Sequence, residues 1–231
     1  MEGSVAAKSP KNGSPRNGST DKTRTRFLNA AETLFAERGY QGTTIRTIAR
    51  LSNAPLSSLS HYWGNKQALF KEVCVRRFSP VRAEQMRRFA TIRDDLDAGR
   101  AVDIRVLLRA LVEPSLNMEG MSEEDRAIYR ALYGRAYTEP LPEVLATMRE
   151  IYDEDGHLML SLMRRLCPDL TPQDFFWRAN SAIGALVISL AYGDRLAAFL
   201  GGEFSKPDWS KAADTIVNFL AAGMLAAPAQ S

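Results

Sequence analysis

The side chains best suited to chemistry gather in one short polar stretch in the N-terminal third. Within six residues it holds three serines, a histidine and a tyrosine: Ser57, Ser58, Ser60, His61 and Tyr62. Their hydroxyl, imidazole and phenol groups can donate and accept hydrogen bonds, and Lys66 adds a positive charge close by. Such a set favours contact with another polar surface over the chemistry of a buried reaction centre.

Groups that could catalyse a reaction are sparse. The chain has two histidines, His61 and His157, which lie about a hundred positions apart with no cluster of cysteines or carboxylates around either. Its two cysteines, Cys74 and Cys167, lie in helical patterns without metal-ligand spacing and are predicted to be buried thiols. We therefore predict a protein that is not an enzyme and that holds no metal or cofactor.

Charge is divided unevenly along the chain. Residues 1–93 hold 17 Lys and Arg against 6 Asp and Glu, a net charge of +11, whereas residues 94–231 hold 13 against 21, a net charge of −8. A small basic N-terminal part favours nucleic acid as partner, because neutralising phosphates releases condensed counterions. A solvated basic surface without a partner is the simpler alternative.

The composition of the N-terminal residues and the length of the apolar stretches indicate which kinds of segment the chain contains. Residues 1–20 contain almost nothing to bury and are predicted to form a disordered basic arm, with or without contact to DNA. No apolar stretch approaches the roughly 18 residues of a membrane span, and no signal peptide precedes the basic part. We expect a cytoplasmic protein without a membrane partner.

Three helices are predicted before Lys66. An apolar stripe over residues 21–39 ends at Gly39, which supplies the left-handed residue after a helix. Thr44 can cap a second helix that runs to about residue 51.

The third helix, over residues 55–62, should turn Leu56, Leu59 and Trp63 inward and leave its serines, His61 and Tyr62 outside. Two short helices joined by a tight turn, the second with a polar face, are what a helix-turn-helix DNA reader requires. A plain three-helix core with a polar face is the alternative. Lys66 favours the helix-turn-helix interpretation. A cation in the first turn of a capped helix interacts unfavourably with the helix dipole, unless a bound phosphate offsets that interaction.

Residues 22–72 resemble the TetR-type one-component transcriptional regulators. The resemblance runs through FLNAAETLFAERGYQGTTIRTIARLSNAPLSSLSHYWGNKQALF and departs from the family pattern at Asn53, Pro55, Ser57 and Ser60. It implies that the third helix enters the major groove of double-stranded DNA, with Ser57, Ser58, Ser60 and His61 near bases or backbone. It also implies that Thr44, Tyr62 and Lys66 hold phosphates.

The C-terminal two thirds are predicted to be entirely helical. One helix starts after Asn65 and is expected to kink or end at Pro80, and others are expected near 103–117, 122–138, 142–166, 172–200 and 208–226. The fold class is therefore all-α, with about nine helices. Residues 21–65 would form the DNA-binding head, and residues 66–227 a helical domain for effector binding and dimerisation.

Two apolar helices favour a homodimer. Residues 182–192 are apolar on nearly every face, which a surface helix of a monomer would not tolerate, and the last helix offers a second apolar surface. The family resemblance implies that these two helices form a four-helix bundle with a second copy, and an internal core helix is the alternative. The predicted interface residues are Gly184, Val187, Ile188, Ala191, Ile216, Phe219, Leu220 and Gly223.

A pocket for a small molecule is expected between the C-terminal helices. Aromatic residues, methionines and an asparagine recur there at helical spacing, and few charged residues lie on these inward faces, so an apolar effector is favoured. The alternative is that these residues form an ordinary core. The predicted pocket residues are Tyr129, Tyr133, Met159, Met163, Phe176, Trp177 and Asn180.

These features together predict a ligand-responsive DNA-binding regulator, most simply a repressor that an effector releases from a two-fold symmetric operator. The alternative function is a ligand-binding helical dimer or scaffold that does not bind DNA. The basic head disfavours this alternative.

Overall fold

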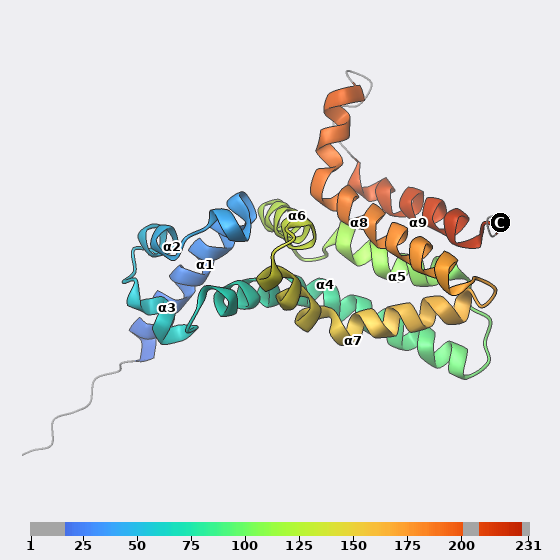
Figure 1. The fold of residues 1–231 in the computed structure, drawn as a ribbon, viewed down its shortest axis with the longest axis horizontal. Helices are drawn as coiled ribbons and strands as arrows, with labels where there is room; N and C mark the ends of the chain where they lie inside the picture. The colour runs from blue at the N-terminus through green and yellow to red at the C-terminus, as the bar shows by residue number, and fades with distance from the viewer. Residues whose placement is uncertain (1–16, 201–207, 228–231) are drawn as a thin grey trace, which may run out of the picture.

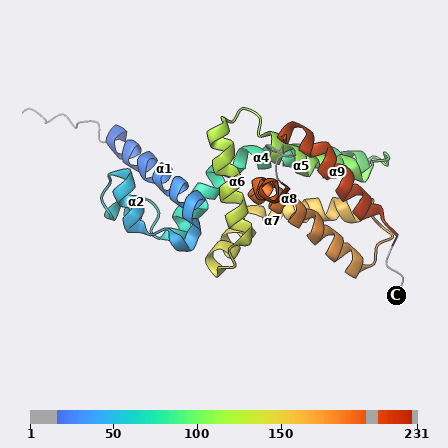
Figure 2. The same ribbon diagram turned by 90° about the horizontal axis from the view of Figure 1, so that it is seen from above.

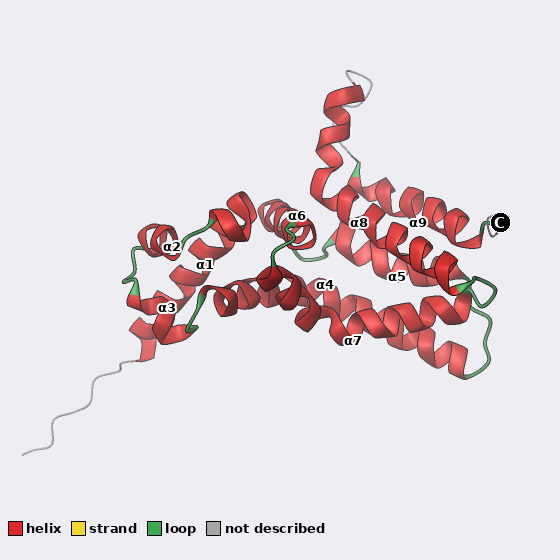
Figure 3. Ribbon diagram, in the orientation of Figure 1, coloured by secondary structure: helices red, strands yellow, loops and turns green. Residues whose placement is uncertain are grey.

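The computed structural model describes residues 17–200 and 208–227, and within these ranges every regular element is a helix (Figure 3). This confirms the predicted all-α class. The helices are α1 (Asn17–Gly42), α2 (Ile45–Ser52), α3 (Ser57–Tyr62), α4 (Lys66–Asp97), α5 (Ile104–Asn117), α6 (Glu123–Thr138), α7 (Pro142–Leu166), α8 (Pro172–Leu200) and α9 (Trp209–Leu225).

The first three helices form a small head at one end of the molecule (Figure 1). Its core is the predicted stripe of α1, in which Phe27, Ala31 and Phe35 are fully buried. Gly39 ends the regular part of α1 with a φ of 72°. Residues 1–16 of the predicted basic arm lie outside the described residues, whereas residues 17–20, which were predicted to belong to the arm, are part of α1.

The helix α4 leads from the head into a larger helical domain. It continues through Pro80, so of the two predicted outcomes the helix does not end there. Proline removes one helical N–H, and in the preceding turn the Ser79 hydroxyl donates to the carbonyl of Val75 at 2.5 Å. Buried side chains on both sides of Pro80, such as Phe78 and Val81, keep the helix packed along its length.

The helix α6 lies between the head and the rest of the larger domain (Figure 2). It packs against α1 on one side and against α8 on the other. On the α8 side the contact is close, because a Cβ added at Gly134 would lie 2.3 Å from the Cβ of Ala191. The helices α8 and α9 run side by side at the far side of the molecule from α2 and α3 (Figure 1).

In the described part of the chain, no helix is long and apolar enough to cross a membrane.

Candidate DNA-binding head and effector pocket

The helix α2 presents arginines that the sequence analysis did not single out. Thr44 caps this helix: its side chain accepts from the backbone N–H of Thr47 at 3.2 Å, and the hydroxyl of Thr47 in turn accepts from the N–H of Thr44. Ile48 and Ala49 are buried, which leaves Arg46 and Arg50 exposed on the outer side. The same period that predicted the inward residues would have placed these arginines outside.

The helix α3 exposes most of the predicted polar residues. Ser57, Ser60 and His61 are exposed, and Tyr62 is half-buried with its ring 4.6 Å from that of His61. Trp63, at the end of this helix, stacks on Phe27 in the head core. The polar face of α3 is therefore directed outward from a head whose core holds the helix in place.

Two residues of this segment are turned the other way from the prediction. Ser58 is buried, with 6% of its surface exposed, and Leu56, which was expected to face the core, is 51% exposed. The regular helix begins at Ser57, and the turn before it is tighter than an α-helix. The N–H of Ser58 bonds to the carbonyl of Pro55 at 3.0 Å and the N–H of Leu59 to that of Leu56 at 3.3 Å, each three residues back, so the α-helical period that was assumed from Pro55 does not apply there. Ser58 thus leaves the set of candidate DNA contacts, and Leu56 joins its surface.

Lys66 is held by the protein itself. Its ammonium donates to the carbonyl of Tyr40 at 2.6 Å and lies 4.1 Å from the centre of the Tyr40 ring. Burial lowers the pKa of Lys66, and the nearby carboxylates of Glu139 and Glu143 oppose that effect. In this structure the charge of Lys66 fastens the end of α1 to the start of α4, and its predicted contact with a phosphate stays a prediction.

Four of the predicted pocket residues lie inside the larger domain and three do not. Tyr129, Tyr133, Met159 and Met163 are buried. Phe176 and Trp177 are each 57% exposed, and Asn180 is exposed too, so these three residues of α8 do not line an internal cavity.

A cavity of about 140 Å³ lies between α4, α5, α6, α7 and α8, and we call it the tyrosine pocket. Two predicted residues, Tyr133 and Met159, line it, whereas Tyr129 and Met163 belong to the surrounding core. Further lining residues that sequence reasoning missed are Gln85, Phe89, Tyr137, Tyr152 and Asp155. Burial raises the pKa of the Tyr133 and Tyr152 phenols, so both are neutral hydrogen-bonding groups at neutral pH.

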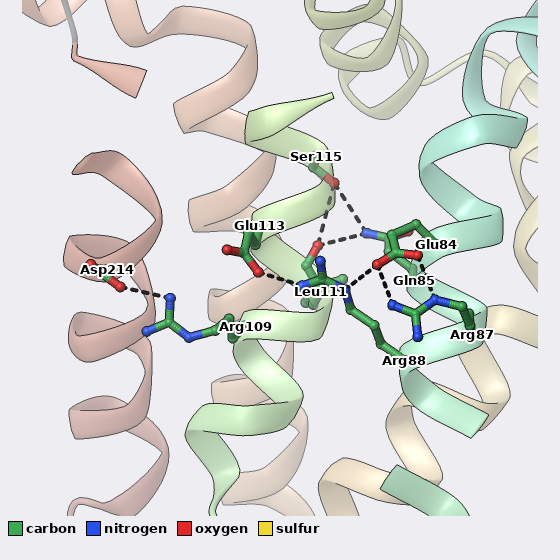
Figure 4. Close-up of polar contacts among 9 residues, drawn as sticks. All are labelled: Glu84, Gln85, Arg87, Arg88, Arg109, Leu111, Glu113, Ser115 and Asp214. Atoms are coloured by element: carbon green, nitrogen blue, oxygen red, sulfur yellow. Dashed lines mark hydrogen bonds and ion pairs between the residues drawn. The ribbon is translucent and has the colours of Figure 1, made fainter. Parts of the chain in front are cut away.

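The charged and amide groups near the tyrosine pocket already have partners. Gln85 donates from Nε2 to the carbonyl of Leu111 at 2.7 Å and to the hydroxyl of Ser115 at 3.2 Å. Beside Gln85, Glu84 accepts from Arg87 and Arg88, and Arg88 reaches Glu113 at 2.5 Å (Figure 4). These bonds tie α4 to α5. The wall of the cavity is largely apolar, and its polar groups are the neutral phenols, Gln85 and the carboxylate of Asp155, which is paired with Arg82.

The predicted dimer residues separate into an outer and an inner set. Val187 and Leu220 are each 5% exposed and Ala191 packs against Gly134 of α6, so these three lie on the inner side, although Leu220 also lines a groove of the outer face; their part in a dimer stays a prediction. Ile188 and Phe219 are 53% and 72% exposed. Gly184, Ile216 and Gly223 are also exposed or half-exposed.

The outer set lines two grooves along α8 and α9. One groove, of about 370 Å³, contains Trp177, Phe219 and Gly223, and the other, of about 500 Å³, contains Gly184, Ile188, Ile216 and again Phe219. The large exposed apolar side chains of α8 and α9 are Phe176, Trp177, Ile188, Tyr192, Phe199, Leu200, Phe219 and Leu225. An apolar face of this extent is typical of a protein interface.

Both buried cysteines are free thiols, as predicted. Among the described residues, no group of three or more His, Cys, Asp or Glu side chains is placed to hold a metal ion.

Two family descriptions match this chain. The description "Bacterial regulatory proteins, tetR family" matches residues 27–73, and "Tetracyclin repressor-like, C-terminal domain" matches residues 109–223. A curated relative, the HTH-type transcriptional repressor KstR2 of Rhodococcus jostii (strain RHA1), is 34% identical over 107 residues, which are 46% of this chain and 48% of that protein. The chain thus spans about half the length of the curated relative that it matches.

Two solved structures show the same arrangement of helices. The regulator FadR from Bacillus subtilis in complex with stearoyl-CoA has a TM-score of 0.57 at 12% identity, over 87% of this chain and 98% of that one. The structure of AibR in complex with isovaleryl coenzyme A and operator DNA has a TM-score of 0.57 at 16% identity, over 86% and 97% of the two chains. At these identities the likeness concerns the fold alone.

Proposed function

The chain belongs to the tetR family of bacterial regulatory proteins, and on that premise we propose that it is a ligand-responsive DNA-binding repressor that acts as a homodimer. The family is one of transcriptional regulators, which supports a role without catalysis. A protein whose ligand is genomic DNA works in the cytoplasm.

The observation that carries this proposal is the outward polar face of α3 on a compact head. Ser57, Ser60 and His61 are exposed there, and Arg46 and Arg50 are exposed on α2. Serine and histidine hydrogen-bond base edges and phosphates, whereas arginine supplies the sequence-independent attraction to the backbone. Thr44 and Tyr62 remain candidates for phosphate contacts, and the exposed Leu56 is suited to the methyl group of a thymine.

The apolar face of α8 and α9 supports the homodimer. A second copy would cover Phe219 and Ile188 with the same face, since closed two-fold interfaces are self-complementary. Two heads would then read a two-fold symmetric operator whose half-sites lie about one DNA turn, roughly 34–36 Å, apart or slightly more.

The tyrosine pocket is the proposed effector site. Its apolar wall and neutral phenols suit a small, largely apolar molecule with a hydroxyl or carbonyl group. The structures of FadR with stearoyl-CoA and AibR with isovaleryl coenzyme A support apolar acyl groups as candidates. At about 140 Å³ the pocket holds only a compact group unless its helices separate.

Sequencing of the DNA fragments that the purified protein retains tests the proposal. We expect a two-fold symmetric motif, and binding to it should weaken steeply with salt and with His61→Ala, because that change removes a group on the reading face. The helical scaffold without DNA activity predicts no enriched motif and no duplex bound at low salt. Either result would refute the repressor.

A further inference from the structure

We infer that Glu72 of α4 is a positioning residue for the helix α3, and that it acts through the indole N–H of Trp63. This role rests on the proposed function, because it takes α3 as the helix that reads DNA. The contacts that carry it lie within the head and the first turns of α4.

The helix α3 holds its own position only weakly. It has six residues, and isolated helices shorter than about 12–15 residues are marginal in water. No side chain caps its start, where Leu56 is the N-cap residue. Of its own residues only Ser58 is buried, and Leu59 is half-buried. The helix therefore depends on contacts that its neighbours provide.

Trp63 attaches the C-terminal end of α3 to the head. Its backbone N–H donates to the carbonyl of Leu59 at 2.8 Å, which closes the last turn. Its ring stacks on Phe27 of α1, with ring centres 5.4 Å apart. Toward the exposed face, the ring of Tyr62 meets Trp63 edge to face at 5.4 Å, and the ring of His61 meets Tyr62 at 4.6 Å. A shift of the indole would therefore shift the rings that lead out to His61.

Glu72 fixes the edge of this indole ring. A stacked ring can slide in its own plane, whereas a hydrogen bond at its edge sets a direction. Oε2 of Glu72 accepts from Nε1–H of Trp63, and Oε1 accepts from Nη2 of Arg24 at 2.5 Å. The guanidinium of Arg24 also lies 5.6 Å from the centre of the indole ring. One carboxylate thus joins α4, the end of α3 and the start of α1, which lie together in the head (Figure 1).

The chemistry of this contact defines two variants that break it. Both partners of Glu72 are donors, so only a group with two acceptor oxygens satisfies them. In Glu72→Gln the amide offers one oxygen and turns its NH₂ group toward the other donor. Trp63→Phe removes the same bond from the other side and keeps a ring that can stack on Phe27.

A measurement without DNA tests whether Glu72 holds α3. The backbone N–H of Gly64, which donates to the carbonyl of Leu59 at 3.0 Å, is present in every variant. We expect Glu72→Gln and Trp63→Phe each to speed amide hydrogen exchange at Gly64 by about tenfold relative to amides of α9, as the loss of one charge-assisted hydrogen bond. The double variant should exchange no faster, because both changes remove one shared bond. The NMR signal of the indole N–H, assigned by its absence in Trp63→Phe, should move upfield in Glu72→Gln.

A measurement with DNA tests whether this position matters for reading. The affinity for a duplex with the motif that the wild-type protein retains is compared with that for a scrambled duplex of equal length. Glu72→Gln and Trp63→Phe should lower the ratio of these affinities by about tenfold, mainly through the motif duplex, since attraction to phosphates does not require an exact placement of α3.

Two controls separate this effect from charge and from stability. Glu150→Gln removes an exposed carboxylate of α7 with the same change of charge, and it should leave both the exchange rate and the ratio unchanged. Val112→Ala removes buried atoms of α5 and lowers stability, and it should leave the ratio unchanged.

Wild-type exchange at Gly64 in both Glu72→Gln and Trp63→Phe would overturn the inference. Faster exchange with an unchanged affinity ratio would overturn it too, because Glu72 would then hold α3 without affecting what the helix reads. A wild-type protein that retains no motif refutes the repressor instead, and the exchange rates then decide by themselves whether Glu72 holds α3.

Discussion

Arg82 of α4 and Asp155 of α7 form a two-point ion pair, with 2.6 Å between Nε and Oδ2 and 3.0 Å between Nη2 and Oδ1. Asp155 is 8% exposed and lines the tyrosine pocket, and the guanidinium lies 5.3 Å from the centre of the Tyr152 ring. The hydrogen bond to Asp155 is the main cause that raises the pKa of Arg82. The pair joins the helix that leaves the head to the wall of the pocket.

Removing one residue of this ion pair should lower the free energy of unfolding more than removing both. Arg82→Ala leaves the carboxylate of Asp155 buried without its counterion and should lower the free energy of unfolding by about 3 kcal/mol. The double variant Arg82→Ala/Asp155→Ala should lose less. Urea unfolding measures both, with Arg165→Ala, which breaks the exposed pair with Asp97, as a control expected to cost less than about 1 kcal/mol. Additive losses in the double variant would contradict this account.

Arg46 and Lys66 should differ in their effect on DNA binding. Arg46→Ala removes an exposed cation of α2 and should lower the slope of log affinity against log salt by about one. Lys66→Met should leave the slope unchanged and lower stability by about 1 kcal/mol, since its ammonium binds Tyr40. Fluorescence anisotropy over a range of salt concentrations measures the slopes. A reduced slope for Lys66→Met would instead support the predicted contact of Lys66 with a phosphate.

Phe219→Glu should convert the dimer into a monomer. Phe219 is 72% exposed and lines both grooves of the α8 and α9 face. A glutamate there would place an unpaired carboxylate from each copy in the apolar interface. Leu145→Glu on α7, where the leucine is 55% exposed outside these grooves, is the matched control and should leave the assembly unchanged. Sedimentation equilibrium decides the matter, and a dimer that survives Phe219→Glu would place the interface elsewhere.

Gly39 and Gly64 should respond differently to alanine. Both have positive φ, 72° and 78°, so either substitution costs about 1–3 kcal/mol of backbone strain, and the ψ of −178° at Gly39 lies in a region that is essentially restricted to glycine. At Gly64 the new methyl group meets nothing within 4 Å, whereas at Gly39 it displaces Glu139 from the N–H of Tyr40. Thermal unfolding should therefore show a greater loss for Gly39→Ala by about 1 kcal/mol or more. Equal losses would mean that the bond from Tyr40 to Glu139 contributes nothing.

The carboxyl group of Glu84 should titrate at unusually low pH. Hydrogen bonds from Arg87 and Arg88 lower its pKa from 4.5 to about 2 (Figure 4). Because the folded pKa is below the unfolded one, the contribution of Glu84 to stability is complete above about pH 4.5 and is lost as the pH falls toward 2. Carbon-detected NMR titration reads the group directly, and Glu84→Gln should flatten that part of the stability profile. A midpoint near 4.5 would show that the two arginines do not hold the carboxylate in solution.

Helix positions followed from local pattern alone. The expected helices near 122–138, 142–166 and 172–200 agree with α6, α7 and α8 to within a residue, because caps such as Ser122 and the apolar period are local properties. The exposed reading face of α3 was predicted for the same reason, at Ser57, Ser60 and His61.

Only the tertiary structure decided which partner each face meets. An apolar period marks Tyr133 and Trp177 alike as residues to be covered, yet the first lines an internal cavity and the second lies on an open face. The sequence predicts a phosphate contact for Lys66 and gives no role to Arg135, whereas the fold brings both within hydrogen-bonding distance of backbone carbonyls at the end of α1. The apolar period of a helix indicates which of its faces must be buried. The partner that buries each face is determined by packing between distant segments, as in the hydrogen bond between Tyr40 and Glu139, which are 99 positions apart.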